Sequence, residues 1–402
     1  MRIMHVISNI GIGGAEASLC ALVEQTAGKG FDHVVVSLLA NGALRPRLEQ
    51  AGASVIELPG KRGVAGVLLL RALATHIARN NPDIVHSWMY HSNIAAAVLR
   101  GLGYFRCPLV WSIRQGVDSP TLDGGLTRFL IRLGARMSAY PEVVVYNSDD
   151  AALTHEAIGY AANRRCIIYN GVDGHRFRPR PEARAALRGQ LGLEPDAVLI
   201  GRVARYSPMK DFDTLMGAFR KCLNRRPSAR LLLVGTDIGL DNEELVALCR
   251  RHGCLDHVLF MGPRLDIEQV YPGLDVLVSS SSGNEGFPNV VAEALASGTL
   301  VASTSIGQSF LIHEGAHRVV PPRNADALCE AILDLVGLPP DRIRQLSEQG
   351  RQFIEVNFSI DAFAGKHMDL YKQLFERRYR PAGKPPSMDA KALPGEGDKI
   401  RN

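Results

Sequence analysis

A polar segment around residue 285 carries groups that could bind a phosphate and neighbouring hydroxyl groups. A serine run leads through the turn Glu285-Gly286-Phe287-Pro288 into a helix expected to begin at Asn289, and Glu293 follows one turn inside that helix. Backbone N–H groups at the start of a helix bind phosphate, so those within residues 287–291 could meet one. The carboxylates of Glu285 and Glu293 could accept hydrogen bonds from vicinal hydroxyls. Two glutamates at this spacing are common by chance, so the Gly-Phe-Pro-Asn turn is what makes the segment specific.

A second loop brings together two cations that could neutralise a dianion. Arg205 and Lys210 lie between an expected strand and an expected helix, and Asp211 could cap that helix. Guanidinium and ammonium groups in one loop can converge on the same phosphate. The alternative interpretation is that both are solvated surface charges beside a capping aspartate.

A glycine-rich loop follows the first expected strand. Gly11-Ile12-Gly13-Gly14-Ala15-Glu16 opens a helix, and its glycines permit a tight turn and the close approach of a phosphate. The dinucleotide fingerprint G-x-G-x-x-G would require glycine where Glu16 stands, and a carboxylate there would repel a pyrophosphate. The loop is therefore either a phosphate-proximal loop of another kind or a plain structural turn.

The elements that must position these loops alternate between short apolar runs and helix-period stretches. Such alternation predicts parallel strands covered by helices on both faces, which is a doubly wound α/β sheet. In the first half, strands are expected at residues 2–8, 33–39, 54–58, 83–87, 108–112, 142–146 and 165–169, and helices at 15–27, 67–79 and 126–137. The pattern then restarts, with strands expected at residues 197–204, 229–234, 257–261, 275–279, 300–303 and 318–320, and helices at 211–223, 243–251, 289–296 and 326–335.

The two halves are predicted to be Rossmann-like domains that face each other across a cleft. Turn and linker residues at 170–173 and 178–181 interrupt the pattern between them. Ligands of such sheets bind at the carboxyl ends of the strands, so the cleft is the expected site. The predicted organisation is a first domain over 1–172, a linker over 173–184, a second domain over 185–356, a C-terminal helix returning to the first domain over 357–378, and a disordered basic tail over 379–402.

Composition and charge exclude several classes of protein. The chain has 402 residues, of which 46% are hydrophobic, enough for two buried cores. Its net charge is +5, but residues 377–402 hold seven Lys/Arg against three Asp/Glu, which leaves +1 for the rest. A near-neutral body argues against a nucleic-acid partner. No apolar run is long enough to span a membrane and the N-terminus does not resemble a secretory signal, so a cytoplasmic location is expected.

The cysteine pattern gives little support for a disulfide framework or a metal site. Seven cysteines are widely scattered and form no C-x-x-C pair. Cys249, His252 and Cys254 are the nearest to a metal-binding cluster, and the alternative is an ordinary helix end. No metal or other cofactor is expected.

These motifs together resemble the family-4 retaining glycosyltransferases of the GT-B fold. The resemblance covers about residues 1–378 and is most specific in 201–211 and 279–298. Besides the loops described above, it rests on the following segments: His86-Ser87-Trp88-Met89-Tyr90-His91, Trp111-Ser112-Ile113-Arg114, Asn147-Ser148 and Asn170-Gly171-Val172-Asp173.

The resemblance implies a nucleotide-diphosphate-sugar donor held mainly by the second domain and an acceptor held mainly by the first. It assigns Arg205 and Lys210 to the donor diphosphate, Glu285 to the transferred sugar, and Glu293 to the nucleotide ribose. The loop that closes over the donor would contain Gly13 and Gly14. The remaining donor-binding positions are Gly286, Phe287, Pro288, Asn289 and Val290.

The sequence departs from the family at Arg114. Many members have histidine there, in contact with the donor sugar or the acceptor, and an arginine cannot act as a base at neutral pH. Arg114 instead suggests an anionic group nearby. His86 and His91 could substitute as acceptor-side residues, or they could be packing and helix-start residues.

The expected reaction is metal-independent loss of a nucleoside diphosphate from an anomeric carbon. Arg205, Lys210 and the helix starting at Asn289 would stabilise the negative charge that develops on the leaving group. Retention could come from double displacement or from same-face attack, and the second is preferred because no residue is an obvious nucleophile. A GT-B-fold nucleotide-sugar epimerase and a non-catalytic nucleotide-sugar-binding module remain as alternatives.

A basic stripe indicates where the acceptor could be presented. Arg128, Arg132 and Arg136 recur every four residues, while Leu126, Phe129, Leu130, Leu133 and Met137 supply an apolar face. A basic amphipathic helix suits an anionic membrane surface, although a solvated face on a core helix is the alternative. The first interpretation predicts a peripheral enzyme on the inner face of the cytoplasmic membrane, acting on a glycan or lipid-linked acceptor in cell-surface polysaccharide or glycolipid synthesis.

Overall fold

The computed structural model describes residues 1–60, 66–117, 124–194, 197–307 and 315–379. The chain divides into two compact units. Unit 1 comprises Met1–Gly171 and the C-terminal segment that begins at Ile360, and unit 2 comprises Val172–Ser359. The basic tail predicted over residues 379–402 lies outside the described residues, apart from the backbone of Tyr379.

Unit 1 contains a seven-stranded parallel sheet with the order β3-β2-β1-β4-β5-β6-β7. Its strands are β1 (Arg2–Ile7), β2 (Asp32–Leu39), β3 (Ser54–Gly60), β4 (Ile84–Trp88), β5 (Leu109–Ile113), β6 (Val143–Tyr146) and β7 (Arg165–Ile167). Successive side chains of a strand point to opposite faces. Along β2, Val34 and Val36 enter one apolar cluster and Val35 enters another, so the sheet is buried on both sides.

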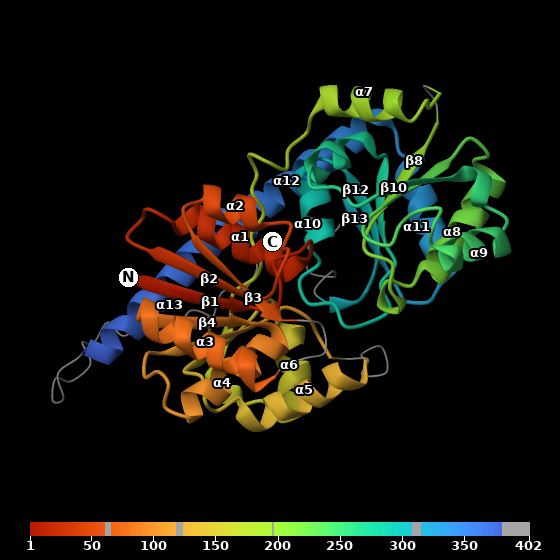
Figure 1. Ribbon diagram of the computed structural model, residues 1–402. Coiled ribbons are helices and arrows are strands. Elements are labelled where there is room, and N and C mark those ends of the chain that lie inside the picture. Colours follow the sequence, from red (N-terminus) through yellow and green to blue (C-terminus); the bar gives the residue numbers. More distant parts are fainter. Residues whose placement is uncertain (61–65, 118–123, 195–196, 308–314, 380–402) are drawn as a thin grey trace. The chain divides into compact units, whose positions relative to one another are not determined.

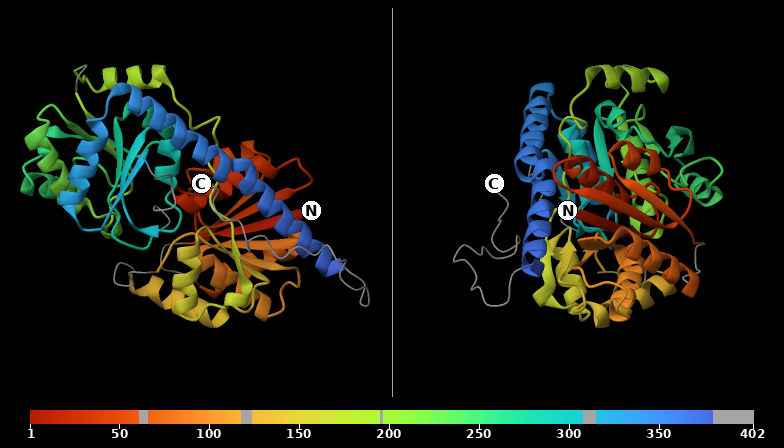
Figure 2. Two further views of the ribbon diagram at one scale, coloured as in Figure 1. Left: turned by 180° about the vertical axis from the view of Figure 1, so that it is seen from behind. Right: turned by 60° about the vertical axis from the view of Figure 1, so that its left-hand side comes forward.

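Helices cover both faces of this sheet (Figure 1). On one face lie α3 (Val67–Asn80), α4 (Met89–Gly101), α5 (Gly125–Met137) and α6 (Asp149–Ala157). On the other lie α1 (Gly14–Thr26), α2 (Arg45–Gln50) and α13 (Ile360–Tyr379). Seen from behind in Figure 2, the long helix α13 runs beside α1, which it contacts.

Unit 2 contains a six-stranded parallel sheet with the order β10-β9-β8-β11-β12-β13. Its strands are β8 (Leu199–Val203), β9 (Arg230–Val234), β10 (Val258–Gly262), β11 (Val276–Ser279), β12 (Leu300–Thr304) and β13 (His317–Val320). Helices α8 (Phe212–Arg225), α9 (Glu243–Arg251) and α11 (Ala325–Val336) pack on one side, and α10 (Asn289–Ala296) and α12 (Pro340–Asn357) on the other, with α7 (Pro181–Gln190) before β8 (Figure 1). The predicted fold class of two doubly wound α/β domains is confirmed.

Polar side chains cap the first turns of helices in both units, as residues of their types commonly do. Ser148 accepts from the Ala151 N–H in α6, and Asp211, Asn242 and Asn324 play the same role in α8, α9 and α11. These caps lie where the strand-to-helix loops end, so they set the points at which the loops at the carboxyl edge of each sheet enter the helices.

Only part of the apolar face expected on α5 is buried. Leu130 is buried, but Leu126 and Phe129 are 53% and 61% exposed. The helix packs through Leu130 together with Ile131 and Gly134. The Tyr160 hydroxyl, which donates to the Ile131 carbonyl oxygen at 3.1 Å, lies so close to Gly134 that a Cβ there would collide with it.

Candidate functional site

The carboxyl edge of the unit 2 sheet brings the two most specific motifs together. β8 and β11 are neighbours and run parallel, so the loops that follow them emerge side by side. The first loop passes through a 3₁₀ turn (Pro208–Lys210) into α8, and the second continues through Glu285 into α10. The Ser282 N–H donates to the Met209 carbonyl oxygen at 2.9 Å, which ties the loops directly.

Lys210 and Glu285 form an ion pair between these loops. Their side chains are 20% and 18% exposed, and Glu285 also accepts a hydrogen bond from Ser281 Oγ at 2.6 Å. Burial alone would raise the pKa of Glu285, but the charge and hydrogen bond of Lys210 and the hydrogen bond of Ser281 hold it below its usual value. Glu285 is therefore a carboxylate at neutral pH.

Arg205 and Asp211 occupy different positions in the same loop. Arg205 is exposed, and its side chain makes no hydrogen bond or ion pair with another of the described residues. Asp211 has a left-handed backbone, φ +46°, and accepts from the Thr214 N–H at 3.1 Å and the Thr214 hydroxyl at 2.7 Å. The capping prediction for Asp211 thus agrees with the geometry, and Arg205 is available to an anion.

The turn before α10 is held by packing. Gly286, Phe287 and Pro288 are buried, and the ring of Phe287 lies 5.0 Å from that of Phe358. Asn289 and Val290 begin the helix and are half-buried. The N-cap residue of α10, Pro288, makes no side-chain capping hydrogen bond. Phe287 and Pro288 therefore fix the direction of the helix, while its first turn faces the same edge of the sheet as Lys210.

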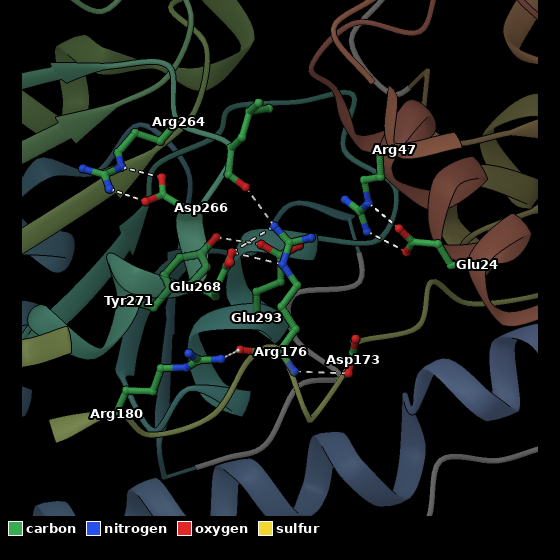
Figure 3. Close-up of polar contacts among 11 residues, drawn as sticks. Glu24, Arg47, Asp173, Arg176, Arg180, Arg264, Asp266, Glu268, Tyr271 and Glu293 are labelled. Carbon is green, nitrogen blue, oxygen red and sulfur yellow. Dashed lines mark hydrogen bonds and ion pairs between the residues drawn. The ribbon is translucent and has the colours of Figure 1, made fainter. Parts of the chain in front are cut away.

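Glu293 belongs to a polar cluster next to this edge (Figure 3). It accepts a hydrogen bond from the hydroxyl of Tyr271, which is fully buried. Nearby, Arg176 donates through Nε and Nη2 to Glu268 at 3.0 and 2.9 Å. Burial raises the pKa of Glu293 to about 7, against the lowering effects of the Tyr271 hydrogen bond and the Arg176 charge. Glu293 changes charge near neutral pH.

In unit 1, the glycine-rich loop lies at the start of α1. Gly13 precedes the helix in an extended conformation, φ −168°, and Gly14 is its first residue. The Glu16 carboxylate folds back so far that a Cβ on Gly13 would collide with it. Residues 11–13 form a bend before the helix, and the Glu16 carboxylate lies against Gly13.

The structure does not place His86 where an acceptor could reach it. His86 is fully buried, and its two ring nitrogens are hydrogen-bonded to Tyr371 Oη at 2.6 Å and Ser112 Oγ at 2.8 Å. Burial lowers its pKa well below the usual value. His86 is a core residue, because α13 covers this side of the sheet. His91, by contrast, is exposed in the first turn of α4.

Arg114 is also buried, with 8% of its surface exposed. Its guanidinium lies 4.9 Å from the Trp88 ring and 5.7 Å from the Phe363 ring, and Nη1 donates to Asn170 Oδ1 at 3.0 Å. Burial lowers its pKa to about 9. Its contacts among the described residues are aromatic rings, an amide and a carbonyl, not the anion that the sequence suggests.

The cysteines form no metal site within the described residues. All seven are buried and free. Cys249 and Cys254 lie against Met216 Sδ, whereas His252 Nε2 is hydrogen-bonded to Asp213 at 3.0 Å. The helix-end interpretation of this cluster agrees with the geometry.

Two family models match most of the chain. One, described as Glycosyltransferase Family 4, matches residues 12–176, and another, described as Glycosyl transferases group 1, matches residues 194–337. Gly13 and Gly14 fall inside the first range, and Arg205, Lys210, Glu285 and Glu293 fall inside the second.

Curated relatives include D-inositol 3-phosphate glycosyltransferases from several organisms. The protein of Rhodococcus erythropolis is 28% identical over 58% of this chain and 53% of its own length, and that of Actinosynnema mirum is 31% identical over 64% of each chain. The match thus spans about half to two thirds of these relatives. A third such protein, from Catenulispora acidiphila, is 25% identical over 90% of this chain and 91% of its own length.

Solved structures share the fold. Anabaena HepE in complex with UDP and glucose superposes with a TM-score of 0.81 at 21% identity, over 93% of this chain and 100% of that chain. Sucrose-phosphate synthase from Thermosynechococcus elongatus gives a TM-score of 0.80 at 22% identity, over 94% and 100%. With two matching family models and this shared architecture, the chain belongs to the family-4 glycosyltransferases of the GT-B fold.

Proposed function

We propose that the protein is a retaining glycosyltransferase that takes its sugar from a nucleotide-diphosphate-sugar donor bound by unit 2. The observation that carries this proposal is the Lys210–Glu285 pair at the carboxyl edge of the sheet, beside the start of α10. This edge of the sheet thus presents a cation and a helix N-terminus, both of which can bind a diphosphate, and a carboxylate that can bind the hydroxyls of the attached sugar.

Each group has a role in the departure of the diphosphate. An ammonium group has three N–H donors, so Lys210 can hold Glu285 and still donate to a phosphate oxygen. Arg205, exposed in the same loop, adds a second cation. These charges stabilise the leaving group more as the anomeric bond breaks, which is the condition for lowering the barrier. In this scheme the protein side chains neutralise the diphosphate and no metal is needed.

Glu285 and Glu293 would fix the two ends of the donor. Glu285 remains ionised and can accept hydrogen bonds from sugar hydroxyls, while Glu293, held by Tyr271, can accept them from the ribose. Attack by the acceptor on the face from which the diphosphate leaves would retain the anomeric configuration. The departing phosphate oxygen would then take the acceptor's proton.

A donor panel tests this function. Release of free nucleoside diphosphate is measured for UDP-glucose first, since HepE is solved with UDP and glucose, and then for other nucleotide sugars. D-inositol 3-phosphate, the acceptor in the relatives' names, and lipid-linked glycans are added as acceptors. An acceptor-dependent glycoside supports a transferase. Interconversion of the donor without acceptor would indicate an epimerase, and binding without turnover a non-catalytic module.

We also propose that the acceptor is presented at an anionic membrane, as in polysaccharide or glycolipid synthesis at the inner face of the cytoplasmic membrane. No described helix is long and apolar enough to cross a bilayer. On α5, however, exposed Leu126 and Phe129 stand on the same helix as exposed Arg128, Arg132 and Arg136. Apolar and basic side chains exposed together suit a lipid interface.

Liposome co-sedimentation tests the membrane proposal. Binding to anionic vesicles should exceed binding to neutral ones, with about 1 kcal/mol of attraction per basic residue near the surface. Replacing the three α5 arginines with glutamine should remove the difference. As a control, replacing Arg342, Arg344 and Arg351 of α12 with glutamine removes the same number of positive charges from another helix. This control variant should still bind anionic vesicles better than neutral ones. Equal binding to both vesicle types, or equal loss in both triple variants, contradicts the proposal.

A further inference from the structure

An arginine to which the sequence analysis assigns no role lies beneath the Lys210–Glu285 pair. Arg202 belongs to β8 and is 1% exposed. Its Nη1 donates to Ser279 Oγ at 2.9 Å and to the Val278 carbonyl oxygen at 3.3 Å, both in β11. Its Nη2 donates to the Lys210 carbonyl oxygen at 3.3 Å and to Ser281 Oγ at 3.4 Å. One side chain therefore connects the ends of two neighbouring strands to both motif-bearing loops.

These contacts form a closed ring of hydrogen bonds that includes the ion pair. Arg202 Nη2 donates to the Lys210 carbonyl oxygen, and Lys210 Nζ donates to Glu285. Glu285 also accepts from Ser281 Oγ, and Ser281 Oγ in turn accepts a hydrogen bond from Arg202 Nη2. Ser280 Oγ adds a hydrogen bond to the Lys210 carbonyl oxygen at 2.9 Å. Because every member holds two others, a shift of the guanidinium would displace both Lys210 and Glu285.

The charge of Arg202 is not neutralised by a carboxylate in direct contact. Its hydrogen bonds go to hydroxyl and carbonyl oxygens, and Nε has no partner among the described residues. Burial lowers its pKa to about 10, so it stays charged at neutral pH, and the carboxylates of Glu285 and Asp211 act on it electrostatically. A buried cation without a contacting carboxylate is costly. It does, however, add positive potential where an anion would bind.

We propose that Arg202 is a positioning residue that holds Lys210 and Glu285 in the geometry that binds and activates the donor diphosphate. This inference rests on the proposed function. It predicts that Arg202 acts through the Lys210–Glu285 pair, so Arg202→Gln has little further effect once Lys210→Ala has broken that pair.

A double-mutant cycle tests the coupling. Arg202→Gln, Lys210→Ala and the double variant are compared for release of nucleoside diphosphate from the donor that the wild-type protein turns over. UDP affinity is measured by calorimetry in parallel. Arg202→Gln should lower kcat by about 10- to 100-fold on its own, but by less than threefold in the Lys210→Ala background. Arg202→Lys, which keeps the charge, should recover part of the rate.

A matched control separates positioning from stability. Arg188 joins the same two strands at their opposite ends, where Nη1 pairs with Asp275 at 3.2 Å and Nη2 with the Ala197 carbonyl oxygen. Arg188→Gln should reduce the melting temperature as Arg202→Gln does, yet change kcat less than twofold. If Arg202→Gln does not fold, Arg202→Met, which removes the charge and the hydrogen bonds while keeping most of the side-chain volume, replaces it in the cycle.

Two results would overturn the inference. One is a change in kcat of less than threefold in the folded Arg202 variant, and the other is a double variant whose loss is the product of the two single losses. A wild-type protein that neither binds UDP nor releases nucleoside diphosphate from any donor overturns the proposed function together with this inference. A wild-type protein that is active while the cycle shows no coupling overturns the inference alone.

Discussion

Tyr271 Oη donates a hydrogen bond to Oε2 of Glu293 at 2.7 Å, and this bond leaves the other carboxylate oxygen for a second partner. Tyr271 is itself fixed, because it is fully buried and its carbonyl oxygen accepts from Thr299 Oγ1 at 2.7 Å. The orientation of the Glu293 carboxylate is thus set by a residue that need not touch the ligand.

Tyr271→Phe should weaken donor binding with little effect on the chemical step. A hydrogen bond to a charged group is worth about 1.5–3 kcal/mol, so we expect donor KM to rise about 10- to 150-fold while kcat changes less than threefold. Steady-state kinetics measures both. Tyr160→Phe, which removes a buried hydroxyl from unit 1, is the control and should leave KM unchanged. An unchanged KM in Tyr271→Phe would show that Glu293 is oriented by other contacts.

Donor affinity should rise with pH between 6 and 8. Burial raises the pKa of Glu293 to about 7, and with Tyr271 donating to Oε2 only the ionised carboxylate leaves Oε1 free to accept from a ribose hydroxyl. About a tenth of Glu293 is ionised at pH 6 and about nine tenths at pH 8, so affinity should improve about tenfold. Calorimetry with UDP-glucose measures it, and Glu293→Gln should give a flat, weaker profile. An equally steep profile in that variant would assign the titration to another group.

Unit 1 should lose stability as the pH falls below about 6.5. Burial lowers the pKa of His33 to about 4 and that of His367 to about 3, and it holds His5 and His86 well below their usual value. The unfolded chain binds these protons first, so each histidine removes about 1.4 kcal/mol per pH unit between its unfolded and folded pKa.

Urea unfolding followed by tryptophan fluorescence measures this loss, because both tryptophans, Trp88 and Trp111, lie in unit 1. The free energy of unfolding should fall steeply between pH 6 and pH 5. His33→Asn should make the slope shallower, since one buried imidazole is removed. A free energy that stays constant over this range would mean that the histidines are protonated in the folded protein.

The product should keep the donor's anomeric configuration, and EDTA should leave the rate unchanged. Both follow from same-face attack with Lys210 and Arg205, in place of a metal, neutralising the diphosphate. Proton NMR of the new linkage decides the first point and a chelator titration the second. An inverted product would rule out the proposed mechanism, and loss of activity restored by added Mg²⁺ would show that side chains alone do not suffice.

Local chemistry made much of the fold predictable. The helices expected at 243–251 and 289–296 have the same bounds in the structure, because a capping asparagine starts the first and the Phe287-Pro288 turn starts the second. Apolar runs such as that of β2 are buried on both sides of a parallel sheet, as their composition indicates. The sequence predicted that Lys210 and Glu285 each lie in a loop after a strand. It did not predict that their side chains contact each other.

Long-range packing determines the surroundings of the residues whose roles the sequence did not predict. Arg202 could not be recognised from β8 alone, because its partners in β11 lie more than seventy residues further along and depend on the strand order. His86 looked like an acceptor-side residue, but it is covered by Tyr371, 285 residues away in α13. Arg114 suggested an anion, whereas folding placed it between Trp88 and Phe363. In each case the partner lies in an element that local sequence does not reveal.

The turnover of Lys210→Ala tests the central claim most directly, namely that the carboxyl edge of the unit 2 sheet activates a nucleotide-sugar diphosphate. Release of nucleoside diphosphate is measured with the donor that the wild-type protein accepts, and Arg188→Gln serves as the folded control. Losing one such transition-state contact should cost about 2.7–4 kcal/mol, so kcat should fall about 10²- to 10³-fold in Lys210→Ala while the control stays close to wild type. A loss of less than threefold in kcat/KM, with the variant folded, would contradict the account.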